Sequence, residues 1–210
     1  AGTGYLTHAL SERYPQAQVY AVDFASQMLR QARQHTPQQH FICADVVQLP
    51  FATNSIDLIV SNLLLPWCDD INPVFVELVR VLHQTGVLLF STLGPDTLKE
   101  LRRSASQANM TIPPNLLMDM HDVGDRLLHA GLRDVVTDVD WFTTTHKDVH
   151  GLLRQLKNSG LRNFTQERPR GLTGRYKFQA MITAYERYRS PEGQLPATIE
   201  VIYGYGRGQK

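Results

Sequence analysis

The sequence has few cysteines and no long hydrophobic run. A membrane-spanning helix needs about 18 consecutive apolar residues, and no stretch of the 210 residues approaches that length. Cys43 and Cys68 are the only cysteines, which fits a reducing compartment better than a disulfide framework. No secretory signal pattern stands out. With 42% hydrophobic and 20% charged residues, the composition predicts one globular, cytoplasmic domain without membrane contact.

Motifs of two large enzyme classes are also missing. The G-x-S-x-G sequence of serine hydrolases does not occur. His146 and His150 have the i, i+4 spacing of two metal ligands on one helix, but Lys147-Asp148 takes the place of the Glu in H-E-x-x-H, and no third ligand stands out. The sequence therefore predicts neither a serine nucleophile nor a metal site.

Short β-rich runs alternate with helical patterns through the first half of the chain. This alternation is typical of an α/β fold, a parallel sheet with helices on both faces. Within it, we expect Cys43 to lie in a buried strand and Ser26 to cap a helix. The predicted strands cover residues 18–23, 41–45, 56–62 and 87–91, and the predicted helices begin near Leu6, Ser26 and Asn72.

The second half of the chain is less regular. Loops are predicted around Pro113-Pro114 and over 160–177, where glycine and proline recur, and His121 falls in a loop before a helix. Helices are predicted over 97–108, 122–130, 148–159 and 178–188, and strands over 133–144 and 197–203.

A glycine-rich turn, Ala1-Gly2-Thr3-Gly4, precedes the first predicted helix. Glycines let backbone amides approach a ligand closely, and the N-terminus of the following helix favours negative charge. The third glycine of the dinucleotide motif G-x-G-x-x-G is replaced by Thr7, which disfavours a pyrophosphate-bearing cofactor.

The sequence contains no predicted strand before this turn. We therefore expect an N-terminally truncated chain that lacks the first, central strand of its sheet. Such a strand buries apolar side chains worth about 1.5–3 kcal/mol each. We accordingly expect these 210 residues alone to be unstable and to bind their cofactor poorly.

Polar residues stand at the ends of three predicted strands. Asp23 follows 19 residues after Gly4, where a carboxylate can hold ribose hydroxyls. Asp45 ends the next strand, where it can accept from an adenine amino group, and Asn62 ends the one after that. Because the carboxyl ends of parallel strands form the ligand crevice of such sheets, these residues predict an adenosine-containing cofactor.

The same motifs, in the same order, resemble those of class I S-adenosylmethionine-dependent methyltransferases. The segments that carry this resemblance are Gly2-Thr3-Gly4, Asp23, Ala44-Asp45-Val46, Ser61-Asn62 and Glu77-Leu78-Val79-Arg80-Val81-Leu82 before Gly86. Other segments are similar to the malonyl-[acyl-carrier-protein] O-methyltransferases of biotin synthesis, namely 62–68, 90–98, 118–124, 171–175 and 195–204. Pro66 departs from this pattern, since relatives often carry Gln before the Trp.

The resemblance implies one Rossmann-like methyltransferase domain, with a cofactor-binding half over 1–93 and a substrate-side half over 94–210. The implied cofactor is S-adenosyl-L-methionine, and the implied reaction is methylation of a malonyl carboxylate on acyl carrier protein. His121 and Arg154 are the candidates for positioning that carboxylate. The implied cofactor-binding residues are Gly2, Thr3, Gly4, Asp23, Phe24, Met28, Asp45, Val46 and Asn62.

Ordinary structural roles compete with the substrate-side assignments. His121 could instead cap the helix that follows it, and Arg154 could be a solvated surface residue, as long charged side chains mostly are. Trp67 could pack on the substrate, but an aromatic residue after a strand more often belongs to the core.

Positive charge is concentrated in one part of the chain. The net charge is +1, yet residues 151–180 carry seven Lys or Arg residues against a single Glu. This segment could be a solvated face, could meet RNA phosphates, or could dock an acidic protein. Because no RNA-binding module accompanies it, we expect a monomeric enzyme that docks acyl carrier protein on residues 154–177 and binds no nucleic acid.

Two other functions fit parts of the sequence. Residues 188–198 are also similar to mitochondrial complex I assembly factors of this fold, which hydroxylate an arginine. A non-catalytic scaffold that binds a protein through its basic face is a further alternative, and fold alone does not separate these functions. RNA methylation is disfavoured because no Asn-Pro-Pro-Tyr-like sequence follows the strand that ends at Asn62.

Overall fold

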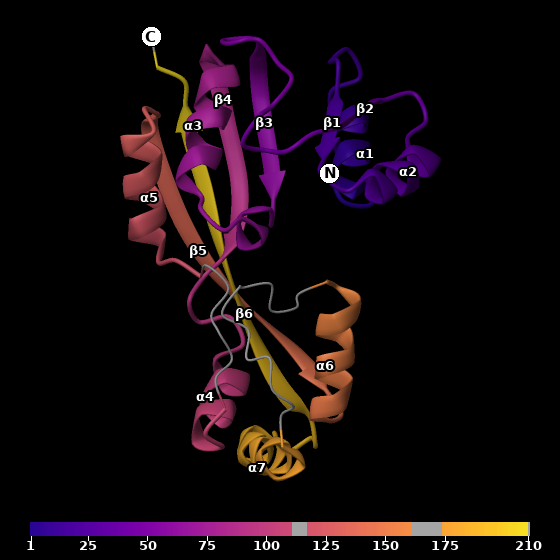
Figure 1. The fold of residues 1–210 in the computed structure, drawn as a ribbon, viewed down its shortest axis with the longest axis vertical. Coiled ribbons are helices and arrows are strands. Elements are labelled where there is room, and N and C mark those ends of the chain that lie inside the picture. The colour runs from indigo at the N-terminus through magenta and orange to yellow at the C-terminus, as the bar shows by residue number, and fades with distance from the viewer. Residues whose placement is uncertain (111–116, 161–173, 210) are drawn as a thin grey trace.

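Two β-sheets with flanking helices make up the structure (Figure 1), a computed structural model that describes residues 1–110, 117–160 and 174–209. The strands are β1 (Tyr20–Asp23), β2 (His40–Cys43), β3 (Ile56–Asn62), β4 (Leu82–Leu93), β5 (Arg133–His146) and β6 (Leu195–Arg207). The α-helices are α1 (Tyr5–Arg13), α2 (Ser26–His35), α3 (Asn72–Val81), α4 (Lys99–Gln107), α5 (Met120–His129), α6 (Val149–Asn158) and α7 (Arg175–Tyr185). Two 3-10 helices, η1 (Leu65–Trp67) and η2 (Glu186–Tyr188), complete the described elements.

The first sheet pairs the short strands β1 and β2 in parallel, next to α1 and α2. Asp23 lies opposite Cys43, so both strands end at the same edge. The helix α1 begins directly after Gly4, whose φ of 89° lies in the left-handed region. A Cβ atom at Gly4 would come within 2.8 Å of the Cβ of Ala32 in α2. Glycine at this position therefore permits both the turn and its close approach to the second helix.

The second sheet is mixed, with strand order β3-β4-β6-β5. β3 and β4 are parallel, whereas β6 runs antiparallel to both β4 and β5. On one face, α3 and α5 pack over the strands and bury Phe75, Leu88 and Leu127. On the other face, Leu89 and Tyr203 remain exposed. Among the described residues, no strand pairs with the outer edge of β1 or of β3.

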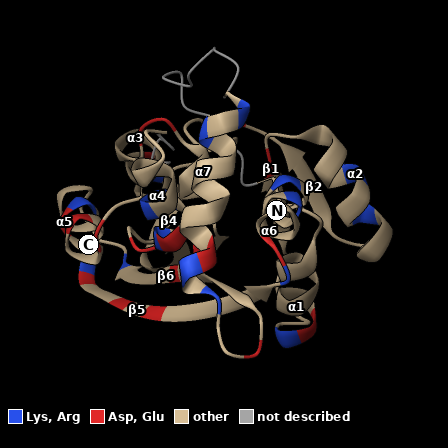
Figure 2. Cartoon of the chain, turned by 90° about the horizontal axis from the view of Figure 1, so that it is seen from below, with Lys and Arg blue, Asp and Glu red and all other residues tan. Residues whose placement is uncertain are grey.

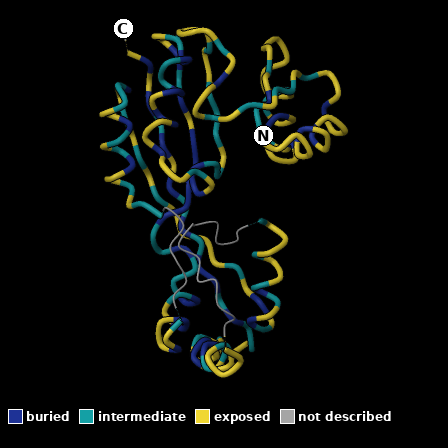
Figure 3. The backbone as a smooth tube through the Cα atoms, in the orientation of Figure 1, coloured by how far each residue is buried: buried dark blue, intermediate teal, exposed yellow. Residues whose placement is uncertain are grey.

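The long strands β5 and β6 carry the chain from this sheet into a second lobe (Figure 1). Their pairing runs from Arg133 opposite Arg207 to His146 opposite Leu195. The helices α4, α6 and α7 surround the far ends of these strands and enclose a separate apolar core, which includes Leu152. Figure 3 shows buried segments in both lobes. The carboxyl ends of β3 and β4 consequently point toward the junction of the two lobes (Figure 1).

The α/β fold predicted from the sequence is confirmed, with corrections in detail. The large sheet is mixed, because β6 pairs antiparallel with both neighbours. Cys43 is exposed rather than buried, since β2 belongs to a sheet of only two strands. Ser26 is the first residue of α2, whose N-cap is Ala25 without a side-chain hydrogen bond, so Ser26 does not cap the helix.

Some predictions fall on residues 111–116 and 161–173, which lie outside the described part of the chain. They include the loop at Pro113-Pro114, most of the basic loop and most of the segment 171–175. The end of the predicted basic loop is helical, because α7 begins at Arg175.

The paired histidines do not share a helix as their spacing suggested, because His146 ends β5 and His150 lies in α6. Among the described residues, no three His, Cys, Asp or Glu side chains gather in a way that could hold a metal ion. None of the helices described is both long and apolar enough to cross a bilayer.

Candidate active site

Hydrogen bonds join the glycine turn to Asp23 at the end of β1. The amide of Gly2 donates to Oδ2 of Asp23 at 2.7 Å, and the amide of Ala25 donates to Oδ1 at 2.8 Å. Because each oxygen of an ionised carboxylate can accept more than one hydrogen bond, Asp23 retains acceptor capacity for ligand hydroxyls.

The environment of Asp23 favours its anionic form. Burial raises the pKa of this carboxyl, but hydrogen bonds from the amides of Ala25 and Gly2 lower it, and the pKa lies below its ordinary value. At neutral pH the side chain is therefore a pure acceptor. This is the chemistry that a ribose diol requires of its protein partner.

Asp45 lies two residues beyond β2, at the same edge of the small sheet as Asp23. Its Oδ1 accepts from the amide of Val47 at 3.1 Å. The amide of Ala44 donates to the carbonyl oxygen of Asp23 at 3.2 Å. The structure thus brings these two acidic residues to one edge, as the order of the motifs predicted.

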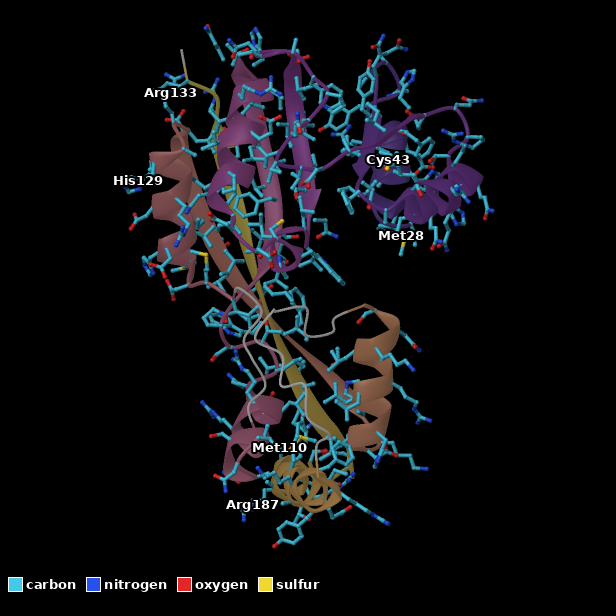
Figure 4. All side chains as sticks on the ribbon, in the orientation of Figure 1. Met28, Cys43, Met110, His129, Arg133 and Arg187 are labelled. Carbon is cyan, nitrogen blue, oxygen red and sulfur yellow. The ribbon has the colours of Figure 1, made fainter. Side chains whose placement is uncertain are left out.

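Apolar residues follow Asp23 and Asp45 closely in the chain. Phe24 is 76% exposed and Met28 is 43% exposed, although both are large and hydrophobic. Val46 is half-buried beside Asp45. Figure 4 shows Met28 projecting from α2 on the side of the first sheet nearer to α6. Exposed apolar surface next to an anionic acceptor suits a ligand with a flat aromatic base and a ribose.

Asn62, at the end of β3, belongs to the second sheet. Its Oδ1 accepts a hydrogen bond from the hydroxyl of Ser91 in β4 at 2.5 Å. Both residues line a cavity of about 340 Å³ on the exposed face of the sheet, together with Leu6 of α1. The cavity therefore connects Asn62 with the helix that follows the glycine turn.

These observations fit an adenosine-bearing cofactor such as S-adenosylmethionine. The glycine turn, in which Gly2 is exposed, leads into the N-terminus of α1. Asp23 supplies an anionic acceptor and Phe24 supplies exposed apolar surface. Thr3, between the two glycines, is exposed at the same turn.

His121 is the second residue of α5, rather than part of a loop before the helix. Asp119 is the N-cap of α5 and accepts both from the amide of His121, at 2.9 Å, and from its ring Nδ1, at 2.7 Å. The backbone hydrogen bond from His121, followed by the one from its ring, lowers the pKa of Asp119. The capping role thus belongs to Asp119, and the His121 side chain remains 79% exposed.

Arg154 is exposed on α6, in the second lobe. It contributes to lowering the pKa of Asp148, the N-cap of α6, but the Gly151 amide contributes most to that shift. The contacts between described residues do not bring Arg154 and His121 together, nor do they join either residue to Asp23. Their roles toward a substrate stay predictions.

A partly buried ion pair that the sequence did not reveal holds the loop after Asp45. Oε1 of Glu77 in α3 accepts from the amide of Leu49 at 2.6 Å, and Arg80 Nε lies 2.7 Å from Oε2 of Glu77. Arg80 also donates to the carbonyls of Leu49 and Phe51. The hydrogen bond from Arg80 is the main reason that the pKa of Glu77 lies below its ordinary value. The only signal in the sequence was the resemblance carried by segment 77–82.

Sequence comparisons relate the chain to known methyltransferases. A family profile described as "Methyltransferase domain" matches residues 1–90. A malonyl-[acyl-carrier protein] O-methyltransferase of Methylovorus sp. is 46% identical over 213 residues, which cover 97% of this chain and 72% of that protein. The enzyme of the same name from Gallionella capsiferriformans is 43% identical and covers 98% of this chain and 73% of its own length.

Structural comparisons agree on the fold. The crystal structure of the YcgJ protein from Bacillus subtilis matches with a TM-score of 0.65 and 16% identity, over 100% of this chain and 89% of that one. Phosphoethanolamine N-methyltransferase 2 of Haemonchus contortus, solved with S-adenosyl-L-methionine, matches with a TM-score of 0.59 and 16% identity, over 99% of this chain and 47% of that one. At this identity the likeness speaks for the architecture alone.

Proposed function

Because the chain belongs to the family of malonyl-[acyl-carrier protein] O-methyltransferases, we propose that it methylates the free carboxylate of a malonyl thioester carried by acyl carrier protein. It is an S-adenosylmethionine-dependent methyltransferase. The resulting methyl ester serves biotin (pimeloyl) synthesis. The observation that carries the cofactor part of the proposal is the anionic carboxylate of Asp23, held against the glycine turn at the carboxyl edge of the first sheet. The substrate part rests on membership of the family.

The reaction requires the carboxylate and the methyl group to be aligned, and it requires no general base. When bound, S-adenosylmethionine supplies an electrophilic methyl group on a sulfonium. A carboxylic acid has a reference pKa of about 4, so the malonyl carboxylate is already ionised and nucleophilic at neutral pH. The protein has to align the reacting groups, and alignment can contribute roughly 7–11 kcal/mol.

The residues of the first half are proposed to hold the cofactor. The amides of the turn at Gly2 and Gly4 approach it closely, and Asp23 accepts from the ribose hydroxyls. Asp45 accepts from the adenine amino group. The remaining proposed contacts come from Thr3, Phe24, Met28, Val46 and Asn62. The motif order and the strand ends described above support this assignment.

His121 and Arg154 are proposed to orient the substrate carboxylate. An arginine offers two parallel donors that match a carboxylate, which fixes its direction as well as its place. The ring of His121 already lies 2.7 Å from Asp119, so its orientation is set before a substrate arrives. Both side chains are exposed, which leaves them accessible to an incoming acyl group.

The basic segment 154–177 is proposed to dock the acidic carrier protein. Its described members, Arg154, Lys157, Arg175 and Lys177, are all exposed. Figure 2 marks Lys and Arg positions of α6 and α7 in blue on the ribbon. Complementary charge mainly raises the rate of association and fixes its register. We further propose one domain, with a cofactor half over 1–93 and a substrate half over 94–210, acting as a monomer.

The activity test uses the purified full-length protein with S-adenosylmethionine and malonyl carrier. A mass gain of 14 on the malonyl group is the expected result. Asp23→Ala should abolish measurable cofactor binding in calorimetry, whereas Asp57→Ala, a change at an exposed aspartate of β3, should leave it intact. A gain of 16 on an arginine of a partner protein would support the hydroxylase alternative, and a wild type without cofactor affinity would support the scaffold.

The docking test reverses charge at two exposed positions, one on α6 and one on α7. Lys157→Glu with Arg175→Glu should raise the KM for malonyl carrier about tenfold at low salt and should leave cofactor affinity unchanged. The effect should shrink as salt screens exposed charges beyond about 10 Å. The control pair, Arg13→Glu with Arg30→Glu, changes the same charge on α1 and α2. An equal rise in KM in that control would rule out a local docking surface.

A further inference from the structure

Two buried glutamates tie the strand β6 to the chain that follows β4, one to the loop and one to the helix α4. Glu100 is 7% exposed and Glu200 is 8% exposed. Glu200 reaches from β6 to the loop, while Glu100 reaches from α4 back to β6. The loop 94–98 and residues 198–200 fall within the segments 90–98 and 195–204, which were both singled out in the sequence.

Glu200 forms hydrogen bonds with the first residues of the loop 94–98. Its Oε2 accepts from the amide of Asp96 at 2.5 Å. A Cβ atom at Gly94 would lie 2.4 Å from the Cδ of Glu200, so this carboxylate covers the backbone of Gly94 directly. The backbone of Glu200 takes part as well, because its carbonyl accepts from the amide of Gly94 at 2.9 Å.

Thr97 and Glu100 extend the same connection. The hydroxyl of Thr97 donates to the carbonyl of Glu200 and accepts from its amide, both at 3.1 Å. The carboxylate of Glu100 accepts from the amide of Thr198 at 3.1 Å and from its hydroxyl at 2.5 Å. The amide of Leu98 donates to the carbonyl of Thr198 at 2.7 Å. The loop 94–98 is therefore held at each step against residues 198–200.

The partners of these carboxylates are amides and hydroxyls. Within the described residues, no ion pair includes Glu100 or Glu200. Burying a carboxylate costs free energy unless it is well hydrogen-bonded. Apolar side chains would pack α4 against β6 without that cost. Leu98 also has a φ of 55°, a left-handed conformation that is unfavourable for leucine. Both features indicate a loop held in one defined shape.

The loop 94–98 lies where a substrate site is expected. It follows β4 directly at the carboxyl end of the strand, three residues beyond Ser91, the hydrogen-bond partner of Asn62. It also leads into α4 of the second lobe (Figure 1), where Figure 4 labels Met110 and Arg187 nearby. Loops at the carboxyl ends of parallel strands form the ligand crevice of such sheets.

We propose that Glu200 and Glu100 are positioning residues that fix the loop 94–98 as a wall of the acyl-substrate site. The inference rests on the proposed function and deepens it, since it assigns the substrate side of the reaction to a second pair of elements. The two halves of the chain each have a loop that is held by a glutamate. Glu77 holds the loop after Asp45 on the cofactor side, and Glu200 holds the loop after β4 on the acyl side.

The experiment compares Glu200→Ala, Glu200→Gln and Glu77→Gln in the full-length protein. Glu200→Ala removes the acceptor of the Asp96 amide and should raise the KM for malonyl carrier about tenfold, with the dissociation constant of S-adenosylmethionine within twofold of wild type. Glu200→Gln keeps an oxygen acceptor and should restore a KM within about threefold of wild type. Glu77→Gln should show the opposite split, with weaker cofactor binding and an unchanged KM for carrier.

The outcomes separate this inference from the proposed function. If wild type does not methylate malonyl carrier, the proposed function fails before any variant is compared. If wild type is active but Glu200→Ala leaves the KM for carrier unchanged, the positioning role is overturned. A Glu200→Ala protein that loses cofactor affinity and carrier affinity by the same factor shows a general structural role, and this too overturns the inference.

Discussion

The indole of Trp67 lies against the backbone of Gly160: a Cβ atom at Gly160 would come within 2.9 Å of Cη2 of the ring. Trp67 ends η1, just after β3, and Gly160 lies two residues beyond α6. Gly160 has a φ of +78°, in the left-handed region. This contact joins the cofactor half of the chain to the second lobe, at the start of the basic segment. It also shows Trp67 as a partly exposed contact residue rather than a core residue.

We expect Gly160→Ala to weaken substrate binding and to destabilise the fold. An alanine in a left-handed conformation costs about 1–2 kcal/mol, and its methyl group would press on the indole. The KM for malonyl carrier should rise several-fold, because Arg154 and Lys157 on α6 would shift relative to the cofactor half. Steady-state kinetics with varied carrier and a thermal melt measure both effects.

Gly174→Ala provides the matched control for that prediction. Gly174 flanks the opposite end of residues 161–173, has no atom within 4 Å of a built Cβ and has a φ of −58°. It should therefore tolerate alanine in both assays. Equal effects of the two substitutions would contradict a specific role for the contact between Trp67 and Gly160.

A second pair of glycines tests the cofactor turn. Gly4→Ala places a methyl group 2.8 Å from the Cβ of Ala32, whereas Gly2→Ala meets no atom within 4 Å, although both residues have positive φ. Overpacking of this kind costs about 1–3 kcal/mol. Gly4→Ala should therefore lose more S-adenosylmethionine affinity than Gly2→Ala, by about tenfold, in isothermal titration calorimetry. A smaller loss in Gly4→Ala than in Gly2→Ala would contradict the close packing of α1 on α2.

The sequence was informative where local pattern and topology act together. Asp23 and Asp45 could be predicted to lie together because each stands at or just beyond the end of a strand, and parallel strands place their carboxyl ends at one edge whatever their side chains do. Asn62 was expected beside them, but it ends a strand of the second sheet. The glycine turn could be recognised because only glycine adopts positive φ without cost. These features depend on residues close in the chain.

Other features depend on partners that are remote in the sequence. Glu200 bonds to an amide 104 residues away, and Glu100 bonds to Thr198 at a separation of 98 residues. Nothing near Glu100 or Glu200 in the sequence distinguishes either residue from an exposed glutamate. The direction of β6 could not be predicted either, because an isolated strand pattern does not specify whether its neighbours run parallel or antiparallel. The burial of Cys43 was predicted wrongly for a similar reason, since its exposure depends on how many strands flank β2.

Tyr185 should anchor the second lobe through one hydrogen bond. Its ring is fully buried, and its hydroxyl donates to the carbonyl oxygen of Pro196 at 2.8 Å. Burial raises the pKa of this hydroxyl, so it remains protonated and able to donate. Tyr185→Phe removes this hydrogen bond and should cost about 0.5–1.5 kcal/mol of unfolding free energy. Urea denaturation measures the loss. Tyr176→Phe, at an 87% exposed tyrosine of the same helix, should be neutral.

The stability of the protein should depend on pH through His146. This side chain is buried at the end of β5, with Nε2 3.0 Å from the hydroxyl of Thr144, and burial lowers its pKa. An unfolded histidine takes up its proton near pH 6.5, whereas the folded one does so only at lower pH. In the window below about pH 6.5 the unfolded chain binds more protons, so the unfolding free energy rises with pH and falls on acidification.

Thermal melts between pH 5 and pH 8 should therefore show a midpoint that decreases below about pH 6.5, and His146→Gln should flatten that decrease. Carboxylates with lowered pKa, such as Asp23, add to stability above their unfolded pKa of about 4 and lose that contribution only at lower pH. The two effects thus occupy separate windows. His150→Gln, at an exposed histidine of α6, serves as the control and should keep the wild-type slope. If His146→Gln also keeps that slope, the pH dependence between pH 5 and pH 7 comes from another group.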